Sequence, residues 1–216
     1  GEMYKKKPFF IVFEGVEGCG KSFQSKKLFN KLKKNKIDTI LTREPGGTKS
    51  SELIRNLILK DYFSKNTKEK FDKYTDTLLY LAARNEHIIN KIKPALKKKK
   101  VVICDRFVDS TLAYQVYGKK VDMNFINNIH KKILGNLKPN LVFVLKVSEK
   151  SSKARLKKRK TTNRYDNFAR SFYVKAQKSF IKIAKNKRNY YTLESSSNDN
   201  TLQVKIFDIV NKYLNI

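Results

Sequence analysis

The feature that most constrains this chain is a glycine-rich segment that directly follows a short apolar run, PFFIVF at residues 8–13. The segment consists of Gly15, Val16, Glu17, Gly18, Cys19, Gly20, Lys21 and Ser22. It matches the pattern G-x-x-x-x-G-K-S/T, in which glycines let consecutive backbone N–H groups turn inward around phosphate oxygens. That pattern occurs between a buried strand and a helix, and the flanking residues predict both. We therefore expect the whole segment to bind a nucleoside triphosphate such as ATP.

Three residues of this loop have distinct expected roles. Lys21 should reach the β- and γ-phosphates, and the Ser22 hydroxyl should bind Mg²⁺. Glu17 is unusual, because a carboxylate beside a triphosphate is repelled unless it points elsewhere, for example towards a hydroxyl of a second substrate. The alternative is that Glu17 is a solvent-exposed loop residue. The loop alone does not distinguish phosphoryl transfer to water, to a protein or to a small acceptor.

Short apolar runs alternate with longer helical patterns along the chain. The runs predict strands at 8–13, 38–42, 101–104, 141–147 and 190–193. Their nearly continuous apolar character is typical of strands that are buried on both faces. The helical patterns cover about 21–36, 50–60, 67–98, 122–135, 149–160, 165–188 and 200–214. This alternation predicts an α/β fold, a five-stranded parallel sheet with helices on both faces. No linker or repeat divides residues 1–216, so we expect a single domain.

The chain carries 49 lysine and arginine residues against 19 aspartate and glutamate residues, a formal net charge of +30. Such a charge is typical of proteins that bind nucleic acids or anionic membrane surfaces. The lysines are scattered over the whole sequence, however, together with many Asn, Ile, Phe and Tyr, which are residues with AT-rich codons. Codon bias therefore explains much of the excess, and we do not expect a nucleic-acid partner.

Other general features of the sequence favour a cytoplasmic location. No apolar run approaches the roughly 18–20 residues that span a bilayer, so no membrane association is expected. The run PFFIVF is short and no small-residue cleavage site follows it, so we expect no signal peptide. Cys19 and Cys104 lack the spacing of a metal site, and free thiols are typical of a reducing cytoplasm. Gly1 and Glu2 precede Met3, which indicates the remnant of an expression tag.

Three further motifs follow the glycine-rich loop. TREPGG at 42–47 follows the second predicted strand, LYLAAR at 79–84 lies in the long helix, and DRFVDSTLAYQ at 105–115 begins at the end of the third strand. Together with EGVEGCGKS at 14–22, their order and spacing resemble those of bacterial thymidylate kinases, a family of nucleoside monophosphate kinases. The resemblance runs from about Phe9 to the C-terminal helix. It implies Mg²⁺-dependent transfer of the γ-phosphoryl group of ATP to dTMP, giving dTDP for dTTP synthesis, by a homodimer.

Charged residues stand at the predicted ends of two strands. Asp105 ends a buried strand at the edge where open α/β sheets bind ligands, so we expect it to hold Mg²⁺ directly or through water. Arg43 and Arg106 lie near the same edge, and two guanidinium groups can hold a monophosphate bidentately. The alternative is that these arginines form surface salt bridges. The resemblance assigns both to the dTMP phosphate.

Tyr80 and Arg84 are four residues apart and share one face of the predicted helix. A ring and a guanidinium on one face can stack on a base and bond to its edge, although an aromatic residue at this spacing more often belongs to the core. By resemblance, Tyr80 stacks on thymine, Arg84 contacts a thymine carbonyl, and Glu17 accepts a hydrogen bond from the 3′-hydroxyl of dTMP. Thr111, Tyr114 and Gln115 correspond to positions near the base and the sugar.

The basic segment KARLKKRKTTNRYD at 153–166 resembles the mobile lid of family members whose phosphate loop lacks an arginine, as it does here at Gly18. Closure of a lid would bring guanidinium groups onto the transferring phosphoryl and exclude water. The alternative is a solvated basic helix. The sequence NRYD stands where the family usually has D-R-x-E, which leaves the pairing within the lid open. The catalytic candidates are Lys21, Arg106, Arg155, Arg159 and Arg164, and Tyr165 is expected near the thymidine.

A strong base is not expected in this site. The acceptor is a phosphate oxygen that is already anionic, and a loose transition state needs alignment and charge neutralisation more than proton removal. We therefore expect no catalytic role for His87 and His130, and we predict that both lie on helix surfaces. Two other functions remain open. One is a kinase of the same fold acting on another nucleoside monophosphate or a deoxynucleoside; the other is a nucleic-acid-binding ATPase, which only the charge supports.

Overall fold

The computed structural model describes residues 4–60, 68–158, 170–197 and 200–216. Five parallel strands form one sheet in the order β2-β3-β1-β4-β5. They are β1 (Phe9–Glu14), β2 (Thr39–Arg43), β3 (Val101–Asp105), β4 (Leu141–Lys146) and β5 (Tyr190–Glu194). The predicted α/β fold with a five-stranded parallel sheet is confirmed, and each strand begins and ends within one residue of its predicted limits.

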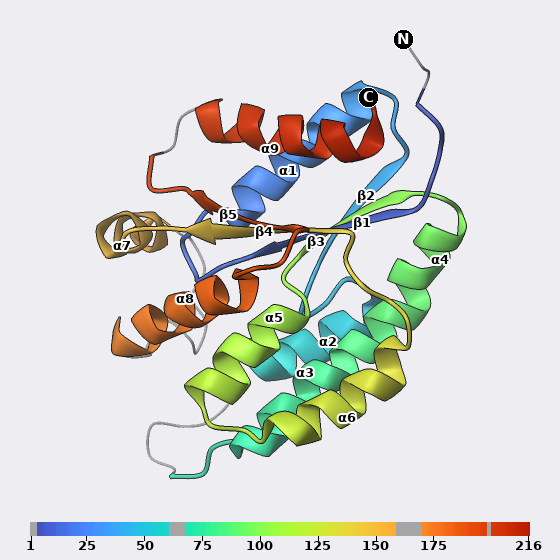
Figure 1. Ribbon diagram of the computed structural model, residues 1–216. Helices are drawn as coiled ribbons and strands as arrows, with labels where there is room; N and C mark the ends of the chain where they lie inside the picture. Colours follow the sequence, from blue (N-terminus) through green and yellow to red (C-terminus); the bar gives the residue numbers. More distant parts are fainter. Residues whose placement is uncertain (1–3, 61–67, 159–169, 198–199) are drawn as a thin grey trace.

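Helices cover both faces of this sheet. The described residues form α1 (Lys21–Lys34), α2 (Lys49–Leu59), α3 (Lys73–His87), α4 (Lys93–Lys97), α5 (Val108–Thr111), α6 (Met123–Leu134), α7 (Glu149–Lys157), α8 (Arg170–Ala184) and α9 (Asn200–Leu214). Figure 1 shows α1 and α9 on one face and the group from α2 to α6, with α8, on the other. Helix α7 lies beyond the end of β4, at the edge of the sheet to which the strands point.

The central strand β1 stabilises the sheet through the burial of its side chains. All six of its residues are buried, and Phe10, Ile11 and Phe13 have no exposed surface. Burial of one such side chain contributes about 1.5–3 kcal/mol, so the apolar runs are held between the two helical layers. Phe13 of β1 lies opposite Asp105 of β3, and Arg43 of β2 also lies opposite Asp105. The register therefore brings the polar ends of three strands to one edge.

Two helical regions differ from the sequence-based prediction. The predicted helix at 67–98 is interrupted by a π-helical turn, η1 (Ile88–Ile92), just before Pro94. Proline donates no backbone hydrogen bond, which accounts for a local change of helical pattern there. A further helix, α5 continuing into the π-helical η2 (Leu112–Gly118), was not predicted. It is stabilised by packing against α8, where Tyr114 stacks on Phe172 and meets Phe180 edge to face.

Other expectations concern single residues or segments. Cys19 and Cys104 are both free and buried, so neither thiol is exposed to a partner. Among the described residues, we find no helix with the length and apolar character needed to cross a membrane. The supposed tag residues 1–2 lie outside the described part of the chain, and so does the C-terminal part of the predicted lid, 159–166.

Candidate active site

A cleft of about 280 Å³ opens where β1, β2 and β3 end. It receives the glycine-rich loop from one side, α2 and α3 from another, and the segment after β3 from a third. The predicted site residues that line it are Glu17, Lys21, Ser22, Arg43, Tyr80, Arg84, Asp105, Arg106, Thr111, Tyr114 and Gln115. The fold therefore gathers residues from four separate sequence motifs into one cavity.

The glycine-rich loop has the backbone conformation that its sequence predicts. Gly15 and Gly18 have φ values of 140° and 76°, which L side chains rarely adopt. A Cβ atom at Gly15 would lie 2.7 Å from the backbone oxygen of Leu145, and one at Gly18 would lie 2.7 Å from that of Ser152. Glycine is thus required twice, at Gly15 because the loop passes close to β4 and at Gly18 because it passes close to α7.

Lys21 is the first residue of α1, and its side chain bonds back to the glycine-rich loop. Its side chain is buried, and Nζ donates a 3.2 Å hydrogen bond to the backbone oxygen of Val16. Val16 and Cys19 are themselves buried in the hydrophobic core, so their side chains support the loop. A phosphate oxygen is a stronger acceptor for an ammonium group than a single carbonyl, so the Lys21–Val16 contact is one that a bound phosphate can replace.

Ser22 and Asp105 form a second polar pair beside the loop. The Ser22 hydroxyl donates to Oδ2 of Asp105 over 2.8 Å. A hydroxyl and a carboxylate oxygen are the hard oxygen ligands that Mg²⁺ prefers, and a magnesium ion at a nucleotide usually takes its other ligands from water and phosphate. In the described part of the chain, no group of three or more His, Cys, Asp or Glu side chains forms a metal cluster. The Ser22–Asp105 pair fits a metal that is shared with a nucleotide.

Two predicted arginines reach the cleft with different partners. Arg43 pairs with Glu52 of α2 at 3.0 Å, with about half of its side chain exposed. Arg106 is more buried; its Nη1 donates to Ser110 Oγ at 2.9 Å and its Nη2 to Glu17 Oε1 at 2.7 Å. A further arginine that the sequence did not reveal, Arg55 of α2, also lines the cavity. Three guanidinium groups thus line the cleft, and two of them, Arg43 and Arg106, are paired with carboxylates.

Glu17 is the residue of the glycine-rich loop that faces Arg106. Its carboxylate is about two-thirds buried and accepts the hydrogen bond from Arg106, whereas its backbone oxygen accepts one from Ser152 of α7. The carboxylate is therefore directed to the side of the cleft where β3 ends. This direction agrees with the expectation that Glu17 points away from the triphosphate.

Arg84 on α3 is the centre of a buried polar network. Nε donates to Glu44 Oε1 at 2.7 Å and Nη2 to the backbone oxygen of Phe107 at 2.9 Å. Nη1 reaches both Thr111 Oγ1 at 2.9 Å and His130 Nε2 at 2.8 Å. Its side chain is only 3% exposed. Most of the N–H donors of Arg84, which the sequence analysis assigned to a nucleobase, are therefore bonded to other groups of the protein.

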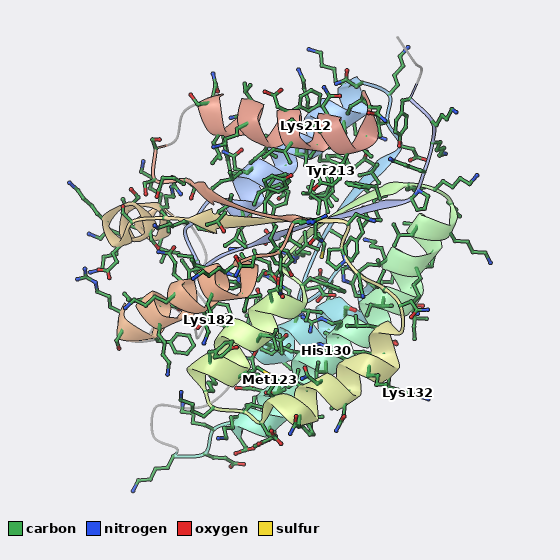
Figure 2. The ribbon with its side chains drawn as sticks, in the orientation of Figure 1. Met123, His130, Lys132, Lys182, Lys212 and Tyr213 are labelled. Carbon is green, nitrogen blue, oxygen red and sulfur yellow. The ribbon has the colours of Figure 1, made fainter. Side chains whose placement is uncertain are left out.

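The prediction that His87 and His130 lie on helix surfaces is wrong. His87 is fully buried, and its ring nitrogens contact Glu44 Oε2 at 2.7 Å and Thr42 Oγ1 at 2.6 Å. His130 lies within the helical layer (Figure 2). It is buried, and its Nε2 lies 2.8 Å from Arg84 Nη1. The available signal was that His87 follows Arg84 by three residues and so shares its face of the helix.

The charges of this network are set by its own members. Burial raises the pKa of Glu44, but Arg84 and His87 more than offset it and hold that pKa below its ordinary value. Burial, and then the nearby Arg84, lower the pKa of His130 to about 3. His130 is consequently neutral at physiological pH, and its Nε2 accepts the hydrogen bond that Arg84 donates.

Two side chains that line the cleft keep unused polar atoms. Among the described residues, neither Tyr114 Oη nor Gln115 Nε2 has a hydrogen-bond partner, although both atoms are buried. Burial raises the pKa of Tyr114, so Oη keeps its proton and can donate. Both residues line the cavity, as Tyr80 does, and they are the groups best placed to bond to a ligand.

Arg155 is the one lid arginine within the described residues. It lies on α7, where Nη1 donates to the backbone oxygen of Gly18 at 3.1 Å and Nη2 donates to the backbone oxygen of Ser195. Arg155 of α7 therefore lies against the loop at Gly18. Arg159, Arg164 and Tyr165 lie outside the described residues.

Comparison with known proteins identifies the family. The family model described as thymidylate kinase matches residues 13–206. The chain belongs to the thymidylate kinase family. A thymidylate kinase of Wolbachia pipientis from Culex pipiens is 38% identical over 94% of this chain and 96% of its own length. That of Aster yellows witches'-broom phytoplasma is 42% identical over 81% and 82%. The crystal structure of the Ehrlichia chaffeensis enzyme is 30% identical and superposes with a TM-score of 0.73, covering 94% of this chain and 99% of that one.

This membership decides between the functions that the sequence left open. The chain is an enzyme, a nucleotide kinase that phosphorylates dTMP to dTDP. Another nucleoside monophosphate as the preferred acceptor is not favoured, and neither is a nucleic-acid-binding ATPase.

Proposed function

We propose that the chain transfers the γ-phosphoryl group of ATP to dTMP in the cleft at the ends of β1, β2 and β3, with Mg²⁺, as a single domain in the cytoplasm. The observation that carries the proposal is the meeting of the glycine-rich loop, the Ser22–Asp105 pair and the arginines at one edge of the sheet. A phosphate donor and a phosphate acceptor can therefore face each other across a few ångströms of cleft.

ATP binds at the glycine-rich loop. The backbone N–H groups of residues 15–20 and the start of α1 surround the β- and γ-phosphates, and Lys21 exchanges its bond to Val16 for a phosphate oxygen. Ser22 and Asp105 hold Mg²⁺, which when bound neutralises charge on the phosphates.

The acceptor nucleotide occupies the other half of the cleft. Arg43 and Arg106 bind the dTMP phosphate, and Glu17 accepts the hydrogen bond of the 3′-hydroxyl. Tyr80 stacks on the thymine ring. Arg84 contacts the edge of the base with its guanidinium group, which Glu44 and His130 already orient. Thr111, Tyr114 and Gln115 complete the contacts to the base and the sugar, since two of them carry buried polar atoms with unused bonding capacity.

Transfer needs alignment and positive charge rather than a base. The phosphate oxygen of dTMP attacks the γ-phosphorus in line, and the bond from the γ-phosphorus to the bridging oxygen of ATP breaks to release ADP. Lys21 and Arg106 neutralise charge on the two sides of the moving group, and Arg155, Arg159 and Arg164 approach it when the lid at 153–166 closes. The closed lid excludes water and so favours transfer to dTMP over hydrolysis.

The enzyme acts as a homodimer through an apolar stripe on α2 and α3. Leu53 and Leu57, four residues apart on α2, are 70% and 43% exposed, and Leu78 of α3 and Ile89 of η1, which continues α3, are also exposed. Apolar side chains of this size are exposed at an energetic cost unless a partner covers them. Sedimentation equilibrium should give about twice the mass of one chain.

The experiment that tests this function is an assay of ADP release with ATP, Mg²⁺ and one acceptor at a time: dTMP, dUMP, dCMP, dGMP and AMP. The proposal expects a strong preference for dTMP. Preference for another monophosphate would keep the phosphate-binding half and remove the thymine contacts. Release that depends on added DNA and on no nucleotide acceptor would contradict the proposal.

A further inference from the structure

Glu14, the last residue of β1, is a buried carboxylate that neither substrate is assigned to contact. It has no exposed surface. A buried carboxylate is unfavourable unless hydrogen bonds compensate for the lost water. Its Oε2 accepts from the backbone N–H groups of Phe107 at 3.2 Å and Ser110 at 3.1 Å, and its Oε1 accepts from the Ser110 hydroxyl at 2.6 Å. The Phe107 donor lies at the N-cap of α5, and the two Ser110 donors lie in the first turn of that helix.

These bonds hold the backbone of Arg106 in an unfavourable conformation. Arg106 has a φ of 73°, in the left-handed region that disfavours residues with a side chain. Phe107, the N-cap residue of α5, has no side-chain cap of its own. Glu14 replaces that cap from the neighbouring strand by accepting the N–H groups that the helix start leaves unpaired. The direction in which Arg106 leaves β3 therefore depends on Glu14.

The same carboxylate also orients the Arg106 side chain. Arg106 Nη1 donates to Ser110 Oγ at 2.9 Å, and a guanidinium group can only donate. The single hydrogen of the Ser110 hydroxyl must therefore go to Glu14. A chain of two hydrogen bonds thus connects the carboxylate to the guanidinium and fixes the direction of both.

We propose that Glu14 is a positioning residue for the phosphate of the acceptor nucleotide, because it sets the backbone and, through Ser110, the guanidinium of Arg106. This inference rests on the proposed role of Arg106 in binding the dTMP phosphate. Ionised Glu14 fixes the Ser110 hydroxyl by accepting its hydrogen, whereas a Glu14 protonated on Oε1 would donate to Ser110 Oγ, and the hydroxyl hydrogen would then have to turn away from Glu14.

The surroundings of Glu14 make this ionisation sensitive to pH near neutrality. Burial, and then the adjacent Asp109 carboxylate of α5, raise the pKa of Glu14 to about 7, while Ser110 and Arg106 act in the opposite direction. Asp109 itself accepts a hydrogen bond from Tyr190 of β5 at 2.6 Å and faces the charges of Lys187 and Arg84. The positioning of Arg106 should therefore weaken as the pH falls through about 7.

The proposal is tested in the full chain with three single variants, Glu14→Gln, Ser110→Ala and Arg106→Ala. A double variant combines Glu14→Gln with Arg106→Ala. We expect Glu14→Gln and Ser110→Ala to raise the KM for dTMP about tenfold and to leave the KM for ATP unchanged. In the Arg106→Ala background, Glu14→Gln should have no further effect, because both changes then remove one function.

A matched control is Asp109→Asn, which alters the neighbouring buried carboxylate that bonds to Tyr190 and not to Ser110. Above about pH 7 it should leave the KM for dTMP unchanged, and it should shift the acidic fall in kcat/KM to lower pH because it removes a charge that raises the pKa of Glu14. Free dTMP also titrates near pH 6. The Glu14 contribution is accordingly the difference between the wild-type and Glu14→Gln pH profiles.

The outcomes separate the two levels of the argument. If Arg106→Ala raises the KM for dTMP and neither Ser110→Ala nor Glu14→Gln does, Arg106 binds phosphate without the help of Glu14, and the inference is wrong. If Glu14→Gln retains its full effect in the Arg106→Ala background, its role is structural and the inference is also wrong. If Arg106→Ala itself leaves dTMP use unchanged, the phosphate-binding role and the inference both fail. Should Glu14→Gln not fold, Ser110→Ala alone, which keeps the backbone cap, decides the question.

Discussion

At the end of the cleft that we propose for phosphate (the phosphate end), Lys21 and Arg43 are held by contacts that a nucleotide can replace, whereas at the end that we propose for the base (the base end) Arg84 is fixed by four internal partners. Lys21 bonds to one backbone oxygen, and Arg43 pairs with Glu52 at the surface. Arg84 bonds to Glu44, Thr111, His130 and Phe107 in the interior. The difference teaches that Arg84 is preorganised by the interior, as Arg106 is by Glu17 and Ser110, whereas Lys21 and Arg43 keep partners that a ligand can replace.

The comparison predicts its largest effect at the phosphate end, on activity alone. Lys21→Ala should lower kcat by at least about a hundredfold, because it removes positive charge where the transition state develops negative charge. Thermal unfolding should change little, since among the described residues Lys21 bonds only within its own loop, to the backbone oxygen of Val16 and to Cys19 Sγ. The exposed Lys26, on the same helix, is the matched control and should tolerate alanine. Near-normal turnover of Lys21→Ala would contradict the assignment of the glycine-rich loop.

The next largest effect is expected at the base end, on stability. Glu44→Ala leaves Arg84 and His87 buried without their shared carboxylate, and loss of one member of a buried ion pair costs about 3–5 kcal/mol of unfolding free energy. Glu52→Ala breaks the exposed pair with Arg43 and should cost under about 1 kcal/mol. Urea denaturation of both variants provides the comparison. Equal losses would show that the two ends do not differ in the way described.

A smaller effect concerns the dependence of stability on pH. The pKa of His130 is about 3 in the folded chain and lies near 6.5 when the residue is unperturbed, so the unfolded chain binds a proton that the folded chain rejects. His130 therefore lowers stability as the pH falls below 6.5, by about 1.4 kcal/mol per unit of pH. Glu14 has the opposite sign, because its raised pKa stabilises the fold at acidic pH and this contribution is lost as the pH rises towards 7.

Because these two slopes oppose each other, the measurement is the difference in unfolding free energy between the wild type and His130→Gln at several pH values. This difference should shrink or reverse as the pH falls from 6.5 towards 4.5. A constant difference would mean that His130 is not neutral in the folded protein.

The smallest predicted effect is a change in the KM for one substrate and not for the other. Glu17→Gln should raise the KM for dTMP about tenfold and spare the KM for ATP, because the carboxylate is directed towards Arg106 and the end of β3. Initial rates with each substrate varied in turn provide the measurement. A change confined to ATP would place Glu17 at the other substrate.

Much of this organisation could be predicted from the sequence. The buried apolar runs gave the five strands because strands buried on both faces contain little else, and the motifs that end these strands gave most of the residues in the cleft. The helix from Val108 to Gly118 was missed because its β-branched and hydroxyl residues favour other local structures, and its stability comes from contact with α8.

The buried network around Arg84 could not be predicted, for a related reason. Sequence spacing says which residues share a helix face but not whether that face packs against another element. Glu44, His87 and His130 come from three distant segments and meet only because α3, α6 and the end of β2 pack together. For the same reason the interior partners of Arg84 were not foreseen, and its role at the base remains a prediction.

Amide hydrogen exchange of the free enzyme and of the enzyme with dTMP and an unreactive ATP analogue tests the comparison most directly. The account predicts that the segments around Arg84 and residues 107–111 exchange slowly with or without ligands, and that residues 15–22 gain protection only when nucleotide is bound. Rapid exchange around Arg84 and residues 107–111 in the free enzyme, with protection acquired on dTMP binding, would contradict a preorganised base end.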